Sequence, residues 1–474
     1  MINIRKSLIA LFFCVIFISA RTNAQNLCPA GKPSDKLVCV IPQVYGPSGL
    51  ANGGALAAVG DHQGHFEDSF LNSLTPLNSE VGSQSSLLPL ASPSSGITFA
   101  WNPITKAFAA STDDLGPILG ERAETIGRYK LFLGSSYQYF KFENMDGVSL
   151  KNLPAVFTHQ DDGDCSISGP NPGPSNTNSC GFVRDVIATN TGVDLKVHQF
   201  TTFITFGLTN RIDVSAVIPI ENVRMGVSSK ATIMDNSDSG DHVFPTTADC
   251  PAPCLNKSFS SSRTASGIGD ITLRVKGTAW RGERAAVALG VDVRVPTGDK
   301  LNFLGSGAAG VRPFVVWSYR SRISPHVVVG YETNGSSVLA GDTSSGSKDR
   351  LPSQLTYAVG ADARITKSFT VAFDLVGQQV FQARRIVIDP NFHDLGPCVP
   401  FDITMSPYCT SAGPAKTYSN VTQVTGSYNN SNASIGLKFR PTAGLLITGN
   451  VLVKLNEGGL RADYVPLVGV SYTF

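Results

Sequence analysis

Residues that could do chemistry are few in this sequence and lie far apart. Seven histidines occupy positions 62, 65, 159, 198, 242, 326 and 393. His62 and His65 are the only close pair, and their Gly-containing surroundings favour a solvated or helix-capping role over a metal site. His198 and His326 could serve a membrane hydrolase only with an activated serine, and no Gly-x-Ser-x-Gly elbow is present. Phosphate-binding loops, paired catalytic carboxylates and metal-ligand clusters are also missing from the sequence. We therefore expect neither an enzyme nor a cofactor.

Two stretches, 159–164 and 235–241, are acidic, and either calcium binding or bridging of lipopolysaccharide phosphates is a conceivable function for them. Neither has the Asp/Asn spacing and distal Glu of a calcium loop. Solvated surface loops are the favoured interpretation.

The cysteines indicate structural bonds. Once Cys14 is set aside with the N-terminal segment described next, the other eight form four local pairs. Short-range pairs in an exported chain are typical of disulfides that brace loops. The close pair Cys250 and Cys254 lacks both the Cys-x-x-Cys spacing and the partner histidines of a redox or zinc site. Proximity alone predicts the disulfides Cys28–Cys39, Cys165–Cys180, Cys250–Cys254 and Cys398–Cys409.

The first residues predict export. Residues 1–24 have a basic start, an apolar run from Leu8 to Ala20, and a small-residue exit at Thr22-Asn23-Ala24, which is the pattern of a secretory signal peptide. The rival reading, a membrane anchor, needs a longer apolar run. After residue 24 no stretch is long and apolar enough for a spanning helix, so any membrane embedding must use strands. A net charge of +2 gives no general attraction to nucleic acid.

From Arg128 onward the chain contains segments in which apolar and polar residues alternate with a period of two, as they do in β-strands. In 284–296, for example, Val287, Leu289 and Val291 share one face. Short and long connectors alternate between the segments, which is the plan of an up-and-down outer-membrane barrel. We predict an all-β, transmembrane antiparallel barrel over 128–474 with strands at 128–142, 193–208, 211–230, 267–280, 284–296, 308–320, 323–334, 354–366, 368–383, 421–440, 443–456 and 463–474.

The end of the chain supports this fold. Val468, Val470 and Tyr472 alternate with Ser471 and Thr473 up to the final Phe474. The last strand of such a barrel pairs with the first to close the sheet. We expect the three larger residues to face lipid, the two hydroxyl residues to face the lumen, and both chain ends to lie in the periplasm.

The opposite face of the strands carries charges of both signs, which lipid would exclude at about 2–4 kcal/mol per cation near the midplane. Mixed signs favour an interior ladder of ion pairs over a filter for polar substrates. The predicted lumenal charges are Asp270, Arg274, Asp292, Arg294, Arg312, Asp362, Arg364, Asp374, Lys438 and Lys454.

Residues 25–127 lack sustained alternation and predict a plug-like or hatch segment, for which we favour the lumen over the periplasm. It holds a short amphipathic helix around His65–Leu77 and a hairpin, 96–101 with 106–110, that could raise the strand count to fourteen. Candidate residues along a substrate path are Phe66, Phe70, Leu74, Phe99 and Trp101. Candidate anchors of the plug to the lumen are Glu121, Arg122, Glu124 and Arg128.

Six stretches resemble a family of outer-membrane barrels labelled as transporters of the phenol meta-degradation pathway. They are Gly116–Gly127, Tyr137–Phe142, Gly267–Leu273, Val293–Asp299, Gly310–Phe314 and Ser324–Tyr331, and the resemblance runs from roughly residue 85 to the C-terminus. The family is distantly similar to long-chain fatty acid transporters, whose barrels carry an N-terminal hatch. The cysteine-bearing loops are not part of the family pattern.

The sequence thus favours a barrel for passive uptake or export of small apolar or aromatic molecules. The alternative is a structural or surface-recognition barrel with stapled outer loops and a closed lumen. Expected partners are outer-membrane lipid and lipopolysaccharide, a small apolar ligand and the barrel assembly machinery, with no nucleic acid.

Overall fold

A computed structural model describes residues 28, 32–46, 50, 57–58, 66, 77, 81, 99–102, 107–110, 115–158, 184–236, 242–245, 248–342, 346–397, 413–442 and 444–474. The predicted signal peptide, 1–24, lies outside these residues. So does most of the predicted helix around His65–Leu77, although Phe66 and Leu77 are described and buried.

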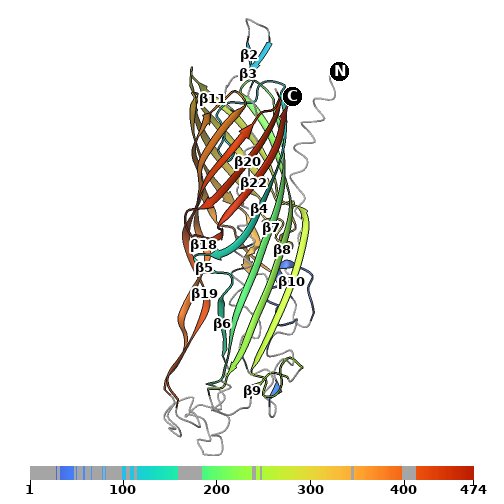
Figure 1. Cartoon of the computed structure of the whole chain (residues 1–474), viewed down its shortest axis with the longest axis vertical. Helices are drawn as coiled ribbons and strands as arrows, with labels where there is room; N and C mark the ends of the chain where they lie inside the picture. The colour runs from blue at the N-terminus through green and yellow to red at the C-terminus, as the bar shows by residue number, and fades with distance from the viewer. Residues whose placement is uncertain are drawn as a thin grey trace, which may run out of the picture.

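Twelve antiparallel strands form a closed barrel, which confirms the predicted fold class (Figure 1). Each predicted strand range overlaps one of them. The ring runs through β4 (Leu131–Met145), β7 (Val186–Gly207), β8 (Ile212–Met234), β11 (Ile271–Arg281), β12 (Ala285–Val295), β13 (Gly310–Tyr319), β14 (Ile323–Asn334), β17 (Ser353–Arg364), β18 (Phe369–Leu395), β19 (Lys416–Phe439), β20 (Leu445–Lys454) and β22 (Tyr464–Thr473).

The last strand closes the barrel against the first, as predicted. In the β22–β4 pair, Val468 lies opposite Tyr137 and Thr473 opposite Phe132. Val468, Val470 and Tyr472 are 57%, 50% and 42% exposed, whereas Thr473 is buried. The strand alternation therefore carries through to the end of the chain.

Large apolar side chains cover the outside of the barrel, among them Leu289, Val329, Phe373 and Ile435. Such a band, about 25 Å tall in known barrels, is stable only against lipid hydrocarbon. The closed sheet and its apolar outer face place the protein in the bacterial outer membrane. Among the described residues no helix is long and apolar enough to cross a membrane.

Four ring strands run far beyond the membrane at the end opposite the C-terminus (Figure 1). These strands are β7, β8, β18 and β19, and β18 alone has 27 residues. The prediction ended β18 at residue 383 because register shifts between Val380 and Ala383, and again between Asp389 and His393, break the alternation of side chains. At the C-terminal end the connectors are short, so this end lies in the periplasm.

Further elements lie in segments predicted as long loops or as the plug-like segment, and one of them, β10, is a full strand. β10 (Asn256–Ile268) continues the line of β11 along β8, with a break at Gly269 and Asp270. Pattern reasoning missed β10 because its serine-rich sequence is exposed or half-buried on both faces and shows no apolar period. The other short elements are η1 (Leu37–Cys39), β1 (Ala57–Ala58), β5 (Val148–Ser149), β6 (Leu153–Thr158), β9 (His242–Val243), η5 (Lys300–Asn302), β15 (Ser336–Asp342), β16 (Ser347–Arg350) and β21 (Leu460–Ala462).

The predicted N-terminal hairpin exists but does not enlarge the barrel. β2 (Phe99–Asn102) and β3 (Ala107–Ala110) pair only with each other, in a separate two-stranded sheet. The alternative of fourteen strands is therefore wrong.

We expect purified protein to migrate differently on gels with and without boiling, because a closed barrel resists detergent at room temperature and unfolds when heated. The measurement is an electrophoretic shift of the unboiled sample in dodecyl sulfate. A single band at one position, from a protein that is monomeric without detergent, would contradict the barrel.

Candidate functional site

A ladder of ion pairs lines the periplasmic half of the lumen. Arg274 on β11 lies between two carboxylates: its Nη1 is 2.6 Å from Oε2 of Glu121, and its Nε is 2.7 Å from Oδ1 of Asp292. Arg312 on β13 donates from Nε to the other oxygen of Asp292 at 3.1 Å. Arg294 pairs with Glu332 at 3.2 Å. Because a buried charge left without a partner is costly, removing one member of these pairs would destabilise the wall.

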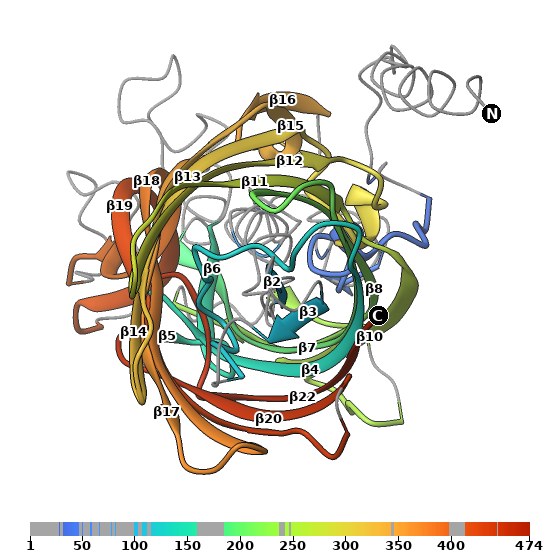
Figure 2. The ribbon, with the colours of Figure 1, turned by 90° about the horizontal axis from the view of Figure 1, so that it is seen from above.

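The segment 115–127 lies across this ladder, inside the ring of strands in the view from above (Figure 2). Lys276 donates from Nζ to Oε1 of Glu121 at 2.8 Å and to the carbonyl oxygens of Arg122 and Glu124 at 2.9 and 3.1 Å. Lys438 donates to the carbonyl of Leu115 at 3.1 Å. Lumenal cations therefore satisfy carbonyl oxygens of a segment that has no regular backbone pairing of its own.

Lumenal carboxylates and hydroxyls accept hydrogen bonds from the backbone N–H groups of the same segment. The backbone N–H of Ile126 donates to Oδ2 of Asp213 at 3.0 Å, and that of Ala123 donates to Oγ of Ser318 at 3.2 Å. Oγ of Ser318 also donates to Glu124 at 2.9 Å. The wall thus contacts the segment through side chains of both charge signs on several strands.

The predicted anchors divide into two groups. Glu121, Arg122 and Glu124 are buried within this segment, and Glu124 also lies 3.4 Å from Nε of Arg320. Arg128 is exposed at the periplasmic rim, where its guanidinium covers the ring of Tyr129 at 4.5 Å. Arg128 therefore does not reach the lumenal charges, because the chain has already left the lumen at this residue to start β4.

Asp270 is buried beside the ladder, with its Oδ2 3.9 Å from Nε of Arg294, and it also binds a loop. Its Oδ1 accepts the N–H of Gly298 at 3.1 Å, and its Oδ2 accepts the N–H of Ser306 at 2.8 Å. A side chain on Gly305 would meet Asp270 Oδ1 at 2.3 Å, so this position needs glycine. Asp270 holds the loop between β12 and β13 against the break between β10 and β11.

His326 on β14 faces the lumen beside two carboxylates. Its Nε2 lies 2.6 Å from Oδ1 of Asp374, and its Nδ1 lies 3.7 Å from Oδ2 of Asp362. His198 faces outward instead, with Nδ1 2.8 Å from the hydroxyl of Tyr137. The two histidines therefore lie on opposite sides of the wall and cannot act in one site.

The prediction missed Lys276, Glu332 and Arg320, which form ion pairs, and Asp213, which accepts the N–H of Ile126. Lys276 stands two residues after Arg274 on the same face, so the strand alternation already contained the signal for it.

On β4, β7 and β8, part of the outer half of the inner wall is apolar. Across β4, β7 and β8, the inward row Gln138, Gln199 and Glu221 is followed by two apolar rows on the extracellular side. These rows consist of Phe140, Val197 and Val223, then Phe142, Leu195 and Met225, all buried. On these three strands the inner wall therefore changes from polar to apolar within one row.

Residues of the N-terminal segment cover this apolar wall. The hydroxyls of Tyr45 and Ser229 are hydrogen-bonded at 2.9 Å, and the ring of Tyr45 meets Phe259 and Phe157 edge-on at 5.0 and 5.8 Å. Burial raises the pKa of the Tyr45 hydroxyl, so it stays protonated for this bond. Leu37, Ile41, Leu50 and Leu77 are fully buried in the same cluster.

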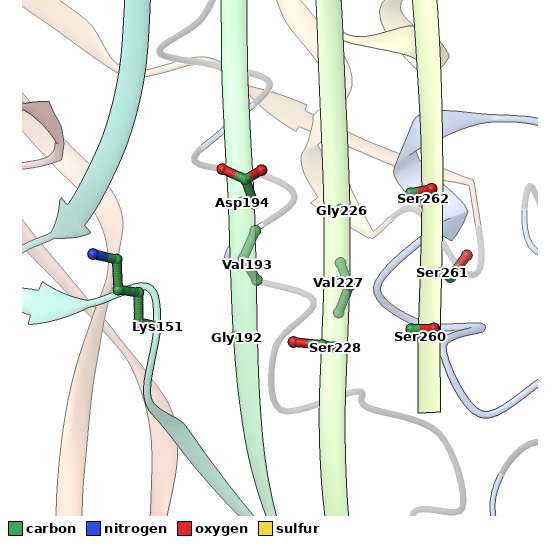
Figure 3. Close-up of a pocket in the computed structure, with 10 residues that line it drawn as sticks. All are labelled: Lys151, Gly192, Val193, Asp194, Gly226, Val227, Ser228, Ser260, Ser261 and Ser262. Atoms are coloured by element: carbon green, nitrogen blue, oxygen red, sulfur yellow. The ribbon is translucent and has the colours of Figure 1, made fainter. Parts of the chain in front are cut away.

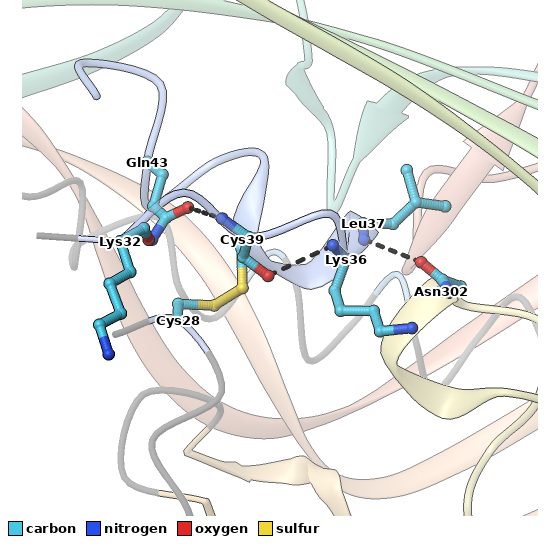
Figure 4. The surroundings of a disulfide bond; sticks show 8 residues. Cys28, Lys32, Lys36, Leu37, Cys39, Gln43 and Asn302 are labelled. Atoms are coloured by element: carbon cyan, nitrogen blue, oxygen red, sulfur yellow. Dashed lines mark hydrogen bonds between the residues drawn. A yellow bond between two sulfur atoms is a disulfide. The ribbon is translucent and has the colours of Figure 1, made fainter. Parts of the chain in front are cut away.

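Within this N-terminal segment a disulfide joins Cys28 to Cys39 (Figure 4). The backbone N–H of Leu37 donates to Oδ1 of Asn302 at 3.1 Å, which ties η1 to η5. Cys250 and Cys254 are also bonded to each other. The predicted pairs Cys165–Cys180 and Cys398–Cys409 lie outside the described residues, as do most of the acidic stretches. In the part of the chain that the structure describes, no group of three His, Cys, Asp or Glu residues could hold a metal ion.

The described candidate residues of the substrate path do not lie together in the structure. Phe66 is buried in the apolar cluster, with its ring 5.2 Å from that of His242. Phe70 and Leu74 lie outside the described residues. Phe99 and Trp101 belong to β2, and Figure 1 shows this hairpin at the end of the barrel where the C-terminus lies. They are therefore separated from Phe66 by the ion-paired part of the lumen.

A family model and several solved structures match this chain. The family model described as "Putative MetA-pathway of phenol degradation" matches residues 173–392. The family resemblance is thereby confirmed. The matched span is narrower than the expected one, and Gly116–Gly127 and Tyr137–Phe142 lie outside it. No curated protein matches the chain.

Several solved outer-membrane structures are similar to this chain at low identity. An outer membrane channel from Pseudomonas putida F1 is 11% identical, with 74% of this chain and 98% of that chain covered and a TM-score of 0.41. A FadL homologue from Pseudomonas aeruginosa is 9% identical, with 73% and 90% covered and a TM-score of 0.29. The toluene transporter TbuX of Ralstonia pickettii is 11% identical, with 80% and 99% covered and a TM-score of 0.27.

Proposed function

We propose that this barrel is a passive outer-membrane transporter for small apolar or aromatic molecules. The observation that carries the proposal is the apolar inner wall formed by residues such as Phe142, Leu195 and Met225 at the extracellular half of the lumen. A barrel for polar solutes would line this entrance with polar groups. An apolar molecule gains free energy there on leaving water, at about 25 cal/mol per Å² of buried surface.

In the proposed mechanism, residues 25–127 act as a plug that has to move for passage. The apolar part of the plug covers the capture surface, and residues 115–127 close the periplasmic half through their ion pairs. Capture at the apolar wall is followed by release when residues 115–127 shift, or through the wall itself.

An exit through the wall has its own support. β8 pairs with β11 only up to Val217 and with β10 from Ile220 onward, and β10 has no second neighbour among the described strands. Next to this free edge, Phe303 and Leu304 are buried in the same apolar cluster as Leu37. Movement of these side chains would connect the apolar cluster to the lipid without opening the ion-paired half.

The alternative function is a structural or surface-recognition barrel, and the lumen filled by residues 115–127 favours it. Transport and recognition differ in what a cell loses without the protein. We expect a deletion strain to take up limiting aromatic compounds or fatty acids more slowly than the complemented strain, and to take up a small sugar at the same rate. Equal uptake of the whole panel would contradict transport and favour recognition.

A further inference from the structure

On the outer surface of four neighbouring strands, β4, β7, β8 and β10, side chains change from apolar to polar within one row. The last apolar row lies 37–53% exposed and consists of the cross-strand partners Tyr137, Phe200, Ile220 and Ile268. The next row towards the extracellular end consists of Tyr139, His198, Asn222 and Ser266. The hydrocarbon boundary lies between these two rows, because the side chains change there from apolar to polar. Successive same-face residues are about 7 Å apart along a strand, so this places the boundary within about 7 Å.

One row further out, three cations stand side by side. Lys141 on β4 lies directly opposite Lys196 on β7, and Lys196 lies directly opposite Arg224 on β8. Like charges directly opposite each other destabilise a sheet. Glu143 lies 3.0 Å from Lys141, and Asp194 lies 2.6 Å from Lys196, so two carboxylates face three cations. Arg224 is exposed and has no ion pair within the described ranges.

A furrow of about 490 Å³ begins directly beyond this row (Figure 3). Asp194, Gly226 and Ser262 form its first row, and Gly192, Ser228 and Ser260 form its second. The two glycines leave the sheet bare, and a side chain on Gly226 would meet only Asp194 and Ser262, at 3.9 Å. The furrow thus has a flat backbone floor with hydroxyl groups beside it and the Lys151 side chain at one edge.

We propose that this surface binds the phosphorylated saccharide headgroup of an outer-leaflet glycolipid, that is, lipopolysaccharide. The phosphate lies against Lys141, Lys196 and Arg224, because guanidinium and ammonium groups donate charge-assisted bonds to phosphate oxygens. The adjoining sugar ring lies in the furrow, with the serine hydroxyls as hydrogen-bond partners. The acyl chains pack along Tyr137, Phe200 and Ile220.

The position of the row identifies the source of the anion. The cations lie in the second row beyond the last apolar row, and successive rows are about 7 Å apart along a strand. This is the level of the phosphates of the outer leaflet. A free anion would contact only the cations, whereas a glycolipid satisfies the apolar row, the cations and the furrow together. This inference rests on the placement of the barrel in the outer membrane and not on what passes through the lumen.

The test uses the full-length protein in detergent, with purified lipopolysaccharide and the same lipopolysaccharide after chemical removal of its phosphates as probes. Binding is measured by thermophoresis, and folding by the gel shift. We expect the triple variant K141Q/K196Q/R224Q to bind lipopolysaccharide at least about tenfold more weakly than the wild type. The control K230Q, which removes a cation from the same face of β8 further from the boundary, should bind like the wild type.

A second pair of variants tests the furrow. Gly226→Val fills its floor, whereas Gly449→Val adds the same group to β20 at a position with nothing within 4 Å. We expect weaker binding for G226V and unchanged binding for G449V. The proposal is overturned if K141Q/K196Q/R224Q binds as tightly as the wild type, or if the dephosphorylated probe binds equally well. Wild-type binding by G226V would overturn the placement of the sugar.

Discussion

Glu121→Lys is expected to open the periplasmic half of the lumen to ions. Glu121 binds Arg274 at 2.6 Å and Lys276 at 2.8 Å, and all three side chains are buried. The substitution removes both ion pairs and places a third cation between the first two. Breaking one buried pair costs about 3–5 kcal/mol, and the added repulsion increases this. We expect residues 115–127 to leave the ladder and single-channel conductance in planar bilayers to rise well above that of the wild type.

Glu283→Lys is the matched control, because it makes the same charge change in the exposed turn between β11 and β12 at the same end of the barrel. Its conductance should equal that of the wild type. If Glu121→Lys folds, as judged by the gel shift, but conducts like Glu283→Lys, then residues 115–127 do not close the lumen and the plug proposal is wrong.

Leu195→Asn is expected to slow the uptake of apolar molecules about tenfold, since one unsatisfied buried amide costs about 1–3 kcal/mol. Leu195 is fully buried on the inner face of β7, opposite Phe142 and Met225 on the neighbouring strands. An amide at this position has no described polar partner in the two apolar rows, so it weakens the capture surface. The measurement is the initial uptake rate of an aromatic compound in a deletion strain that expresses the variant.

His198→Asn serves as the control, because His198 lies on the same strand but faces outward. Uptake by this variant should match that of the wild type. Equal rates for Leu195→Asn and His198→Asn, at equal amounts of folded barrel, would show that the apolar wall is not on the substrate path and would favour the surface-recognition function.

The lumen connects these two expectations. Its inner wall is polar where residues 115–127 dock and apolar where residues of the N-terminal segment pack, with the change occurring beyond the row of Gln138, Gln199 and Glu221. Polar contacts stabilise a segment with exposed backbone groups, and apolar contacts stabilise side chains that leave water. Each half of the lumen thus suits the part of the chain that it holds.

The alternation of residues and the lengths of the connectors were sufficient to predict the barrel. The alternation of residues such as Val468, Val470 and Tyr472 assigned each side chain to the lipid or the lumen, because successive residues of a strand point to opposite faces. Connector lengths then assigned the two ends, since a tight turn can join only neighbouring antiparallel strands. These are local properties, and they do not depend on which residues meet across the fold.

Contacts between distant residues required the tertiary structure. Alternation directs Arg274 into the lumen, but only the path of residues 115–127 decides that Glu121, 153 positions away along the chain, is its partner. In the same way, Lys141, Lys196 and Arg224 form a row only because the register of β4, β7 and β8 aligns them. Register and docking follow from the packing of many residues at once, whereas the face that a residue occupies follows from its own strand.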